Sequence, residues 1–148
     1  TNSVQAIDLV YRKILNNKIF EKYIAQLSNE VKDFAKDNKL SLFADKFFKY
    51  LELLNNFTLW LGEKNKSSKD DVSAACNDYL KVLGYIALAH SWLKILKVSH
   101  SKLKENKTFY EDKINTAKYY FDKILPRVQS HYLSAITGSD TMMKSNFN

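Results

Sequence analysis

The three histidines are the side chains of this sequence best suited to metal binding or to proton transfer near neutral pH. His90 and His100 lie ten residues apart, almost three helical turns, so they cannot hold one metal ion between them. His90 has apolar neighbours, which predicts a hydrogen-bonded histidine in the core or at an interface. His131 has no Cys or carboxylate at the spacing of metal ligands, which predicts a surface position. We therefore expect no metal site.

Two adjacent pairs of carboxylates, Asp70 with Asp71 and Glu111 with Asp112, are the other candidates for acid–base chemistry. Both pairs fall in the first turn of a predicted helix, where the helix dipole alone favours acidic side chains. The sequence contains no Gly-rich phosphate loop and neither the GxSxG nor the HExxH motif. No catalytic residue is therefore predicted within the chain.

Cys76 is the single cysteine, so it cannot form an internal disulfide, and it has no CxxC partner for zinc. The longest uninterrupted apolar run, residues 82–89, is far shorter than the roughly 20 residues needed to span a bilayer. We expect no signal peptide, since the given sequence contains no segment of that type. These features predict a reduced setting, either cytoplasmic or in an organelle matrix, without a membrane span; of the two we expect the cytoplasm.

The formal net charge of +7 and the pI near 9.3 raise the possibility of a nucleic-acid or membrane partner. The basic residues are nearly all Lys and are spread through every segment. Arg, which makes bidentate contacts with phosphates and bases, occurs only as Arg12 and Arg127. We expect no nucleic-acid partner, because no Arg-bearing basic stripe is present.

The composition favours helices, because the 148 residues include only three Gly and one Pro and are rich in Lys, Leu and Ala. Apolar spacing predicts a first helix over residues 4–37, broken near Asn16 and Asn17. Its apolar stripe is Ile7, Val10 or Tyr11, Ile14, Phe20, Ile24, Leu27, Val31 and Phe34. Ser41 is predicted to cap a second helix. The buried face of that helix is predicted to be Phe43, Phe47, Tyr50, Leu54, Phe57 and Leu61.

Residues 62–69 (GEKNKSSK) are predicted to form a helix-breaking linker, after which Ser68 caps a third helix that ends near Glu105. The stripe of the third helix is Cys76, Tyr79, Leu83, Ile86, His90, Leu93 and Leu96. Thr108 and Glu111 have the spacing of a capping box that opens the fourth helix. The stripe of the fourth helix is Tyr110, Ile114, Ala117, Phe121, Leu125, Val128 and Tyr132.

Pro126 lies inside this fourth pattern, which resumes beyond it, so we expect a kink there. Gly138 is predicted to end the helix and residues 138–148 to form a flexible tail. The prediction is an all-α fold, an antiparallel bundle of about four long helices. The nine Phe, nine Tyr and two Trp could line a ligand groove, but aromatic stripes at helical spacing are interpreted as core.

Three stretches carry a family resemblance. TNSVQAIDLVYRK (residues 1–13) is similar to the stretch that follows the catalytic glutamate of acyl-CoA dehydrogenases, with the pattern Y-E-G-T-x-x-I-Q-A-x-D-L-x-x-R-K; the matching residues are Thr1, Gln5, Ala6, Asp8, Leu9, Arg12 and Lys13. NDYLKVLGYIALAHSWLK (77–94) and FYEDKINTAKYYFDKILP (109–126) resemble the helical C-terminal extension of one branch of that family. The ending GSDTMM (138–143) is similar to the end of such chains.

The resemblance implies a parent enzyme that removes the α-proton of an acyl-CoA thioester with a glutamate while a hydride passes to FAD. That glutamate would lie two residues before Thr1, outside the chain. Thr1 and Asn2 correspond to positions that approach the flavin, so they are the candidate cofactor-binding residues. The implied partners are upstream dehydrogenase domains of the same chain, an electron-transfer acceptor and further copies in a homo-oligomer.

The implied organisation places the last helix of the catalytic domain in residues 1–15, the helical extension in 16–137 and the tail in 138–148. The first methionine is Met142, so the sequence is expected to be a piece of a longer chain. The expected function is a structural or interface role within the dehydrogenase, without FAD or activity in the isolated chain. The alternative is a stand-alone helical interaction module. The sequence does not indicate the acyl-chain length or the electron acceptor.

Overall fold

The computed structural model describes residues 2–10, 14 and 18–137 of the chain, and among these every regular element is helical. In chain order the elements are α1 (Asn2–Leu9), α2 (Ile19–Ala35), α3 (Ser41–Ser67), α4 (Lys69–Ser101), α5 (Lys107–Tyr119), a π-helical turn (Tyr120–Ile124) and α6 (Arg127–Ile136). The predicted all-α fold is confirmed. The predicted break at Asn16 and Asn17, and the predicted cap at Gly138, lie outside the described residues.

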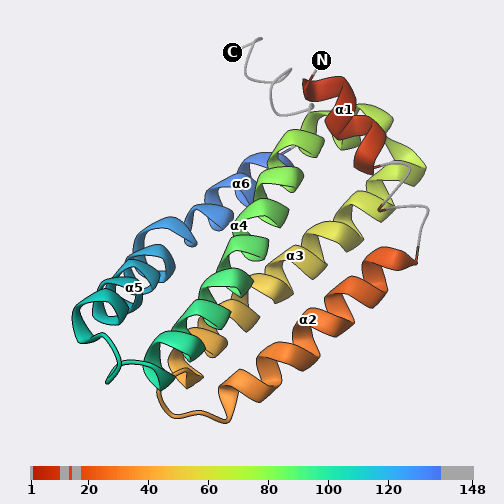
Figure 1. Cartoon of the computed structure of the whole chain (residues 1–148). Helices are drawn as coiled ribbons and strands as arrows, with labels where there is room; N and C mark the ends of the chain where they lie inside the picture. Colours follow the sequence, from red (N-terminus) through yellow and green to blue (C-terminus); the bar gives the residue numbers. More distant parts are fainter. Residues whose placement is uncertain (1, 11–13, 15–17, 138–148) are drawn as a thin grey trace.

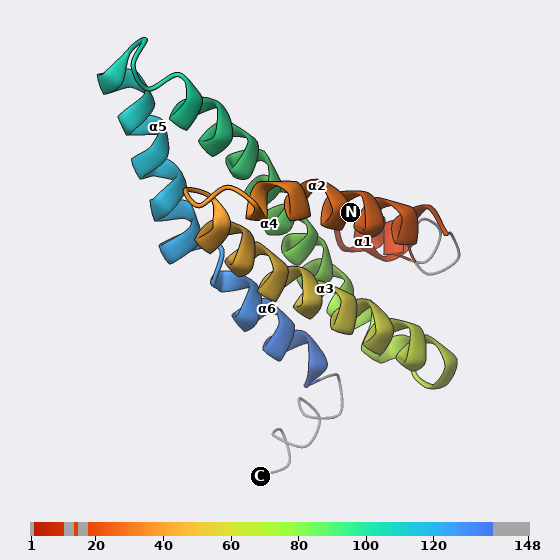
Figure 2. The same ribbon diagram turned by 90° about the horizontal axis from the view of Figure 1, so that it is seen from below.

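The two longest helices, α3 and α4, pack against each other along the middle of the bundle (Figure 1). Short connections make α2 antiparallel to α3, and α3 antiparallel to α4. The helix α2 contacts both α3 and α4 on one side, while α5 and α6 contact α4 on the other (Figures 1 and 2). The short helix α1 lies on the N-terminal half of α4.

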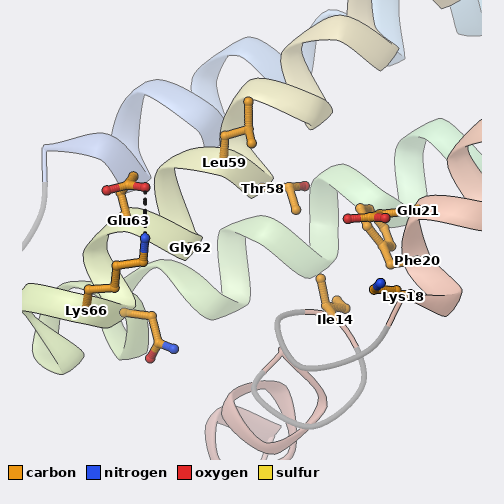
Figure 3. A pocket seen from close by; sticks show the side chains of 10 residues that line it. Ile14, Lys18, Phe20, Glu21, Thr58, Leu59, Gly62, Glu63 and Lys66 are labelled. Carbon is orange, nitrogen blue, oxygen red and sulfur yellow. Dashed lines mark hydrogen bonds and ion pairs between the residues drawn. The ribbon is translucent and has the colours of Figure 1, made fainter.

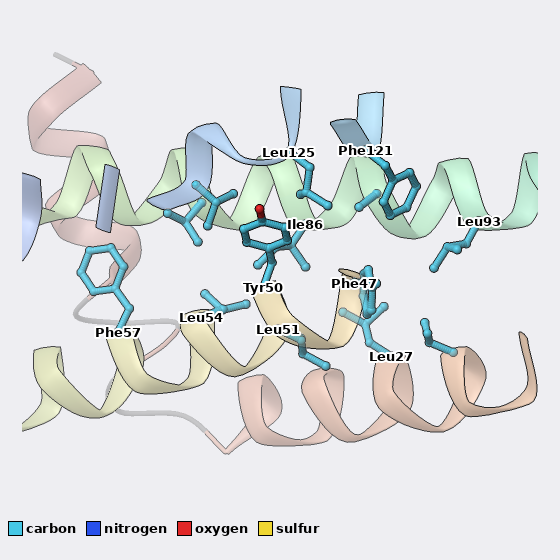
Figure 4. Close-up of a cluster of buried hydrophobic side chains, with 14 of the residues drawn as sticks. Leu27, Phe47, Tyr50, Leu51, Leu54, Phe57, Ile86, Leu93, Phe121 and Leu125 are labelled. Carbon is cyan, nitrogen blue, oxygen red and sulfur yellow. The ribbon is translucent and has the colours of Figure 1, made fainter. Parts of the chain in front are cut away.

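The apolar stripes of these helices meet in one continuous core (Figure 4). All six predicted positions of α3 are buried, and Phe47, Leu54 and Phe57 are fully enclosed. Burying one such side chain contributes about 1.5–3 kcal/mol relative to leaving it exposed. Phe57 of α3 meets the Tyr79 ring of α4 edge-on, with 5.0 Å between ring centroids. Phe43 of α3 meets Phe121 of the π-helical turn in the same way at 5.3 Å, so aromatic contacts join α3 to both of these elements.

The buried face of α4 differs from the predicted stripe at two positions. Val82 and Ala89 are fully buried, whereas Leu83 and His90 are only partly buried. Leu83 faces α1 and α2, where it lines a cavity together with Phe20. The predicted stripe was off by one position at these points, because a helix that packs on several sides carries apolar residues around most of its circumference.

The predicted linker at residues 62–69 is wrong, since α3 continues through Gly62 and ends at Ser67. One glycine costs a helix only about 1 kcal/mol, which the buried stripe ending at Leu61 outweighs. Within residues 62–69, only Ser68 lies outside a helix, and its backbone is extended, with φ −149° and ψ 96°. Its hydroxyl accepts a hydrogen bond from the Asp71 N–H at 3.3 Å, so the predicted cap of α4 is confirmed. Asp71 is buried and lies 3.7 Å from the Lys64 ammonium.

Two other predicted caps are wrong. Leu40 precedes α3 without a side-chain cap, and Ser41 lies inside the helix, with its hydroxyl donating to the Asn38 carbonyl at 3.4 Å. The cap of α5 is Asn106, whose side-chain oxygen accepts from the Phe109 N–H at 3.2 Å, so Thr108 is already helical. Glu111 and Asp112 therefore lie beyond the first turn, where Glu111 pairs with Lys107 at 3.9 Å. The helix α4 also ends earlier than predicted, at Ser101.

At Pro126 the predicted fourth helix divides into α5 and α6. Proline has no N–H, and the preceding Leu125 N–H donates to the Tyr120 carbonyl at 2.8 Å, five residues back, which forms the π-helical turn. The apolar spacing resumes in α6, where Val128 and Ala135 are buried. The sequence predicts a kink within one continuous helix; the structure instead has this turn, and a separate helix, α6, begins at Arg127.

Candidate functional site

The N-terminal helix carries the residues that the resemblance places nearest to the flavin. Thr1 lies outside the described residues, and Asn2 begins α1 with a side chain that is not among those described. Ala6 and Val10 are buried and fasten this segment to the bundle. Arg12 and Lys13, which also match the family pattern, lie outside the described residues.

A cavity of about 550 Å³ lies between the start of α2 and the C-terminal part of α3 (Figure 3). Its charged lining is mixed. Lys18 and Glu21 come from the α2 side, and Glu63 pairs with Lys66 at 3.4 Å on α3. The remaining wall is formed by Ile14, Phe20, Thr58, Leu59, Gly62 and Asn65. The cavity is therefore a surface groove with the Glu63–Lys66 ion pair on one side and apolar residues on the other. The residues that line the cavity include no histidine or cysteine for nucleophilic or metal chemistry.

His90 joins α4 to α2. Its Nε2 lies 2.6 Å from the Glu30 carboxylate, and its ring lies 6.4 Å from that of Phe47. The hydrogen bond with His90, followed by that from Gln26, lowers the pKa of Glu30 below its ordinary value of 4.5. The prediction of a hydrogen-bonded histidine at an interface is confirmed.

His131 does not have the isolated surface position that its sequence context predicted. Its Nδ1 lies 2.8 Å from the Asp78 carboxylate on α4, and its side chain is only 22% exposed. The imidazole stacks on the Tyr85 ring with 5.8 Å between centroids. Asp78 is separated from His131 by 53 residues, so no local spacing could reveal the pair.

The histidines do not converge on one site. His100 lies at the far end of α4, where desolvation first and the charge of Lys39 second lower the pKa of its imidazole. Across residues 2–10, 14 and 18–137, no three His, Cys, Asp or Glu side chains are grouped to hold a metal ion. No helix within the same part of the chain is long and apolar enough to cross a membrane.

The Cys76 thiol and the Tyr79 phenol of α4 are enclosed in the core. The Cys76 thiol donates to the Val72 carbonyl at 3.0 Å, and burial raises its pKa to about 11, which keeps it protonated and unreactive. The Tyr79 hydroxyl lies 2.7 Å from the Thr58 hydroxyl, and desolvation raises the pKa of Tyr79. Sequence reasoning missed this pair, because Thr58 and Tyr79 lie on different helices.

The side chains of His90, His131 and Tyr79 therefore form hydrogen bonds that connect α4 to its neighbouring helices. Residues 27–146 match the family described as "Acetyl-CoA dehydrogenase C-terminal like". No curated protein and no solved structure matches the chain. The family match covers most of the bundle and includes the two stretches on which the resemblance to the C-terminal extension rested. The chain belongs to the acetyl-CoA dehydrogenase C-terminal-like family.

Proposed function

We propose that this chain is the C-terminal helical domain of a flavin-dependent acyl-CoA dehydrogenase, in which it supports the catalytic domains and has no activity alone. The observation that carries the proposal is the family match over residues 27–146. The bundle supports it, because both histidine–carboxylate pairs and the Thr58–Tyr79 hydrogen bond connect helices to one another. These groups hold the domain together and leave the proton transfer to residues outside it.

The general base of the parent reaction would be a glutamate two residues before Thr1, held over the α-carbon of the acyl-CoA. It would take the α-proton, and the hydride from the β-carbon would go to FAD. The contribution of Thr1 and Asn2 to FAD binding rests on the resemblance, since their side chains lie outside the described residues. Their helix, α1, packs on α4, so the position at which upstream sequence would join the bundle is fixed.

The upstream reading frame of the gene tests the proposal first. It should encode flavin-binding domains and end in Tyr-Glu-Gly just before Thr1. An upstream frame without such domains would favour the stand-alone interaction module, and the dehydrogenase assignment would then fail.

Activity of the full-length protein provides the second test. Replacing the upstream glutamate with glutamine should lower turnover by about two to four orders of magnitude while FAD remains bound, because only the proton acceptor is lost. The assay is acyl-CoA-dependent reduction of an artificial electron acceptor. Wild-type turnover in the glutamine variant, or turnover by the isolated chain, would contradict the proposal.

A further inference from the structure

One side of α4 carries mostly apolar and small residues and is only partly covered by other helices. Between α2 on one side and α5 on the other (Figure 1), α4 presents a row that we call the open face: Leu80, Gly84, Ala87, Leu88, Ser91, Ile95 and Val98. Leu88 is 52% exposed and Val98 is 47% exposed. None of these seven residues is charged, and Lys94 is the one charged residue at helical spacing between Ser91 and Val98.

The open face is hollowed at both ends. Near α1 and α2, a cavity of about 540 Å³ is lined by uncharged side chains, among them the exposed Leu9 and Tyr23. Near α5, a cavity of about 420 Å³ lies beside Ile95, Val98 and the half-exposed Phe109. A continuous apolar surface with recesses at its ends is typical of a site that receives another protein segment.

The charged residues that line the cavities of the open face have one sign, although Lys94 also lies near the Glu30 carboxylate of α2. The charged residues that line these two cavities and the shallow cavity next to α1 are Lys81, Lys94 and Lys113. No Asp or Glu occurs in the sequence between Asp78 and Glu105. A fitting partner therefore has an apolar row flanked by carboxylates. A second copy of this chain is a poor fit, because a two-fold contact on this face would bring Lys against Lys.

The position of α1 identifies the source of the partner. Leu9 of α1 lines the cavity at one end of the open face, and the helix is held there by the buried Ala6 and Val10. Because α1 packs on α4 beside one end of the open face, sequence joined to the N-terminus of α1 would be tethered near this face, at an effective concentration of about the millimolar range. We propose that the part of the parent polypeptide upstream of Thr1 docks an apolar, acid-flanked segment on the open face of α4. This inference rests on the proposed function.

Thiol labelling of the full-length protein tests the docking. Ser91→Cys places a thiol on the open face, and Ser130→Cys places a matched thiol on the exposed surface of α6. Cys76 adds little background, because its thiol is buried. In the isolated chain both introduced thiols should react with a maleimide at similar rates. In the full-length protein Ser91→Cys should react more slowly by on the order of tenfold or more, while Ser130→Cys is unchanged.

A glycine pair provides the matched blocking variants. A Cβ added at Gly84, on the open face, or at Gly62, on α3, meets no atom within 4 Å, so neither site has a steric bar to the first carbon of a side chain. In the full-length protein Gly84→Arg should return the labelling rate of Ser91→Cys to that of the isolated chain, and Gly62→Arg should not. Lys94→Glu combined with Lys113→Glu should also expose the thiol, because it would repel the acidic flank.

Fast labelling of Ser91→Cys in the full-length protein would overturn the inference. Slow labelling of the Ser91→Cys thiol in the isolated chain, becoming slower as the chain concentration rises, would also overturn the inference, because it would show self-association. A gene without upstream dehydrogenase domains is a failure of the proposed function, and the reading frame reveals it before any labelling.

Discussion

At His90 the imidazole Nε2 lies 2.6 Å from the Glu30 carboxylate, and at His131 the Nδ1 lies 2.8 Å from that of Asp78. Each pair connects α4 to a helix beside it, α2 in the first case and α6 in the second. The geometry of a carboxylate-oriented histidine also occurs in catalytic sites. Here each ring packs on an aromatic side chain, Phe47 or Tyr85, so the pairs act as polar contacts between helices.

The Glu30–His90 pair predicts a pH dependence of stability. The folded pKa of Glu30 is lowered, so its contribution is present above its unfolded value of 4.5 and is lost as the pH falls through the lower folded value. Glu30→Gln should therefore destabilise the protein at about pH 6, and this difference should shrink as the pH falls below 4.5 and through the lowered pKa of Glu30 in the folded protein. Urea unfolding at a series of pH values measures this difference. Glu21→Gln on the same helix is the control, and a difference for Glu30→Gln that persisted unchanged into acid would refute the assignment.

The residues that sequence reasoning placed correctly are those whose role depends on local pattern. His90 lies among apolar neighbours, and its interface position follows from them. The position of His131 depends on Asp78, which lies on another helix and 53 residues away. Pairing across helices is set by how the helices pack, and a single sequence contains no direct record of that packing.

At the scale of the element, α4 and α5 each begin at a residue whose side chain caps the helix. Asn106 caps α5 through the Phe109 N–H, whereas Thr108 lies within the helix. Asn106→Ala should cost about 0.5–2 kcal/mol of unfolding free energy, because an N–H at the helix start loses its acceptor. Thr108→Ala should change it by less than about 0.5 kcal/mol, as for an ordinary surface site. Chemical denaturation of the two variants decides between them, and the reverse order would restore Thr108 as the cap.

The contact between the C-terminal helices and the rest of the bundle predicts unequal costs for two apolar residues. Phe121 is 1% exposed and meets Phe43 edge-on, so Phe121→Ala should cost about 3–5 kcal/mol. Leu83→Ala should cost less than the roughly 2–5 kcal/mol of a buried leucine, because Leu83 is partly exposed beside α1 and α2. Equilibrium unfolding in urea measures both values. A larger loss for Leu83→Ala would show that Leu83 belongs to the buried face of α4.

The stripes of α2 and α3 could be predicted because each has one dominant buried side. The errors concentrate where two local preferences compete. Gly62 and the polar residues after it are typical of a linker, yet α3 remains helical to Ser67 while its apolar side is packed on α4. At the start of α5, Asn106 and Thr108 are both good caps, and local sequence does not choose between them. The candidate site was predictable only as a resemblance, because Thr1 and Asn2 have no local pattern of their own.

At the scale of the whole molecule, the described residues of the bundle share one continuous hydrophobic core. The isolated chain should therefore be strongly helical by circular dichroism. It should also be colourless, because only Thr1 and Asn2 are expected to approach a flavin, and the resemblance places the remaining contacts upstream. A yellow preparation or a sheet-dominated spectrum would contradict this account.

The same reasoning predicts how FAD affects thermal stability. A ligand that binds only the folded state stabilises it by about 2.7 kcal/mol at a concentration one hundred times its Kd, which raises the Tm by several degrees. Excess FAD should leave the Tm of the isolated chain unchanged, because two residues at the end of a helix do not form a binding site for it. In the full-length protein, removal of FAD should lower the Tm, and its return should restore it. Differential scanning calorimetry measures both, and an FAD-dependent rise in the Tm of the isolated chain would place a flavin site within residues 1–148.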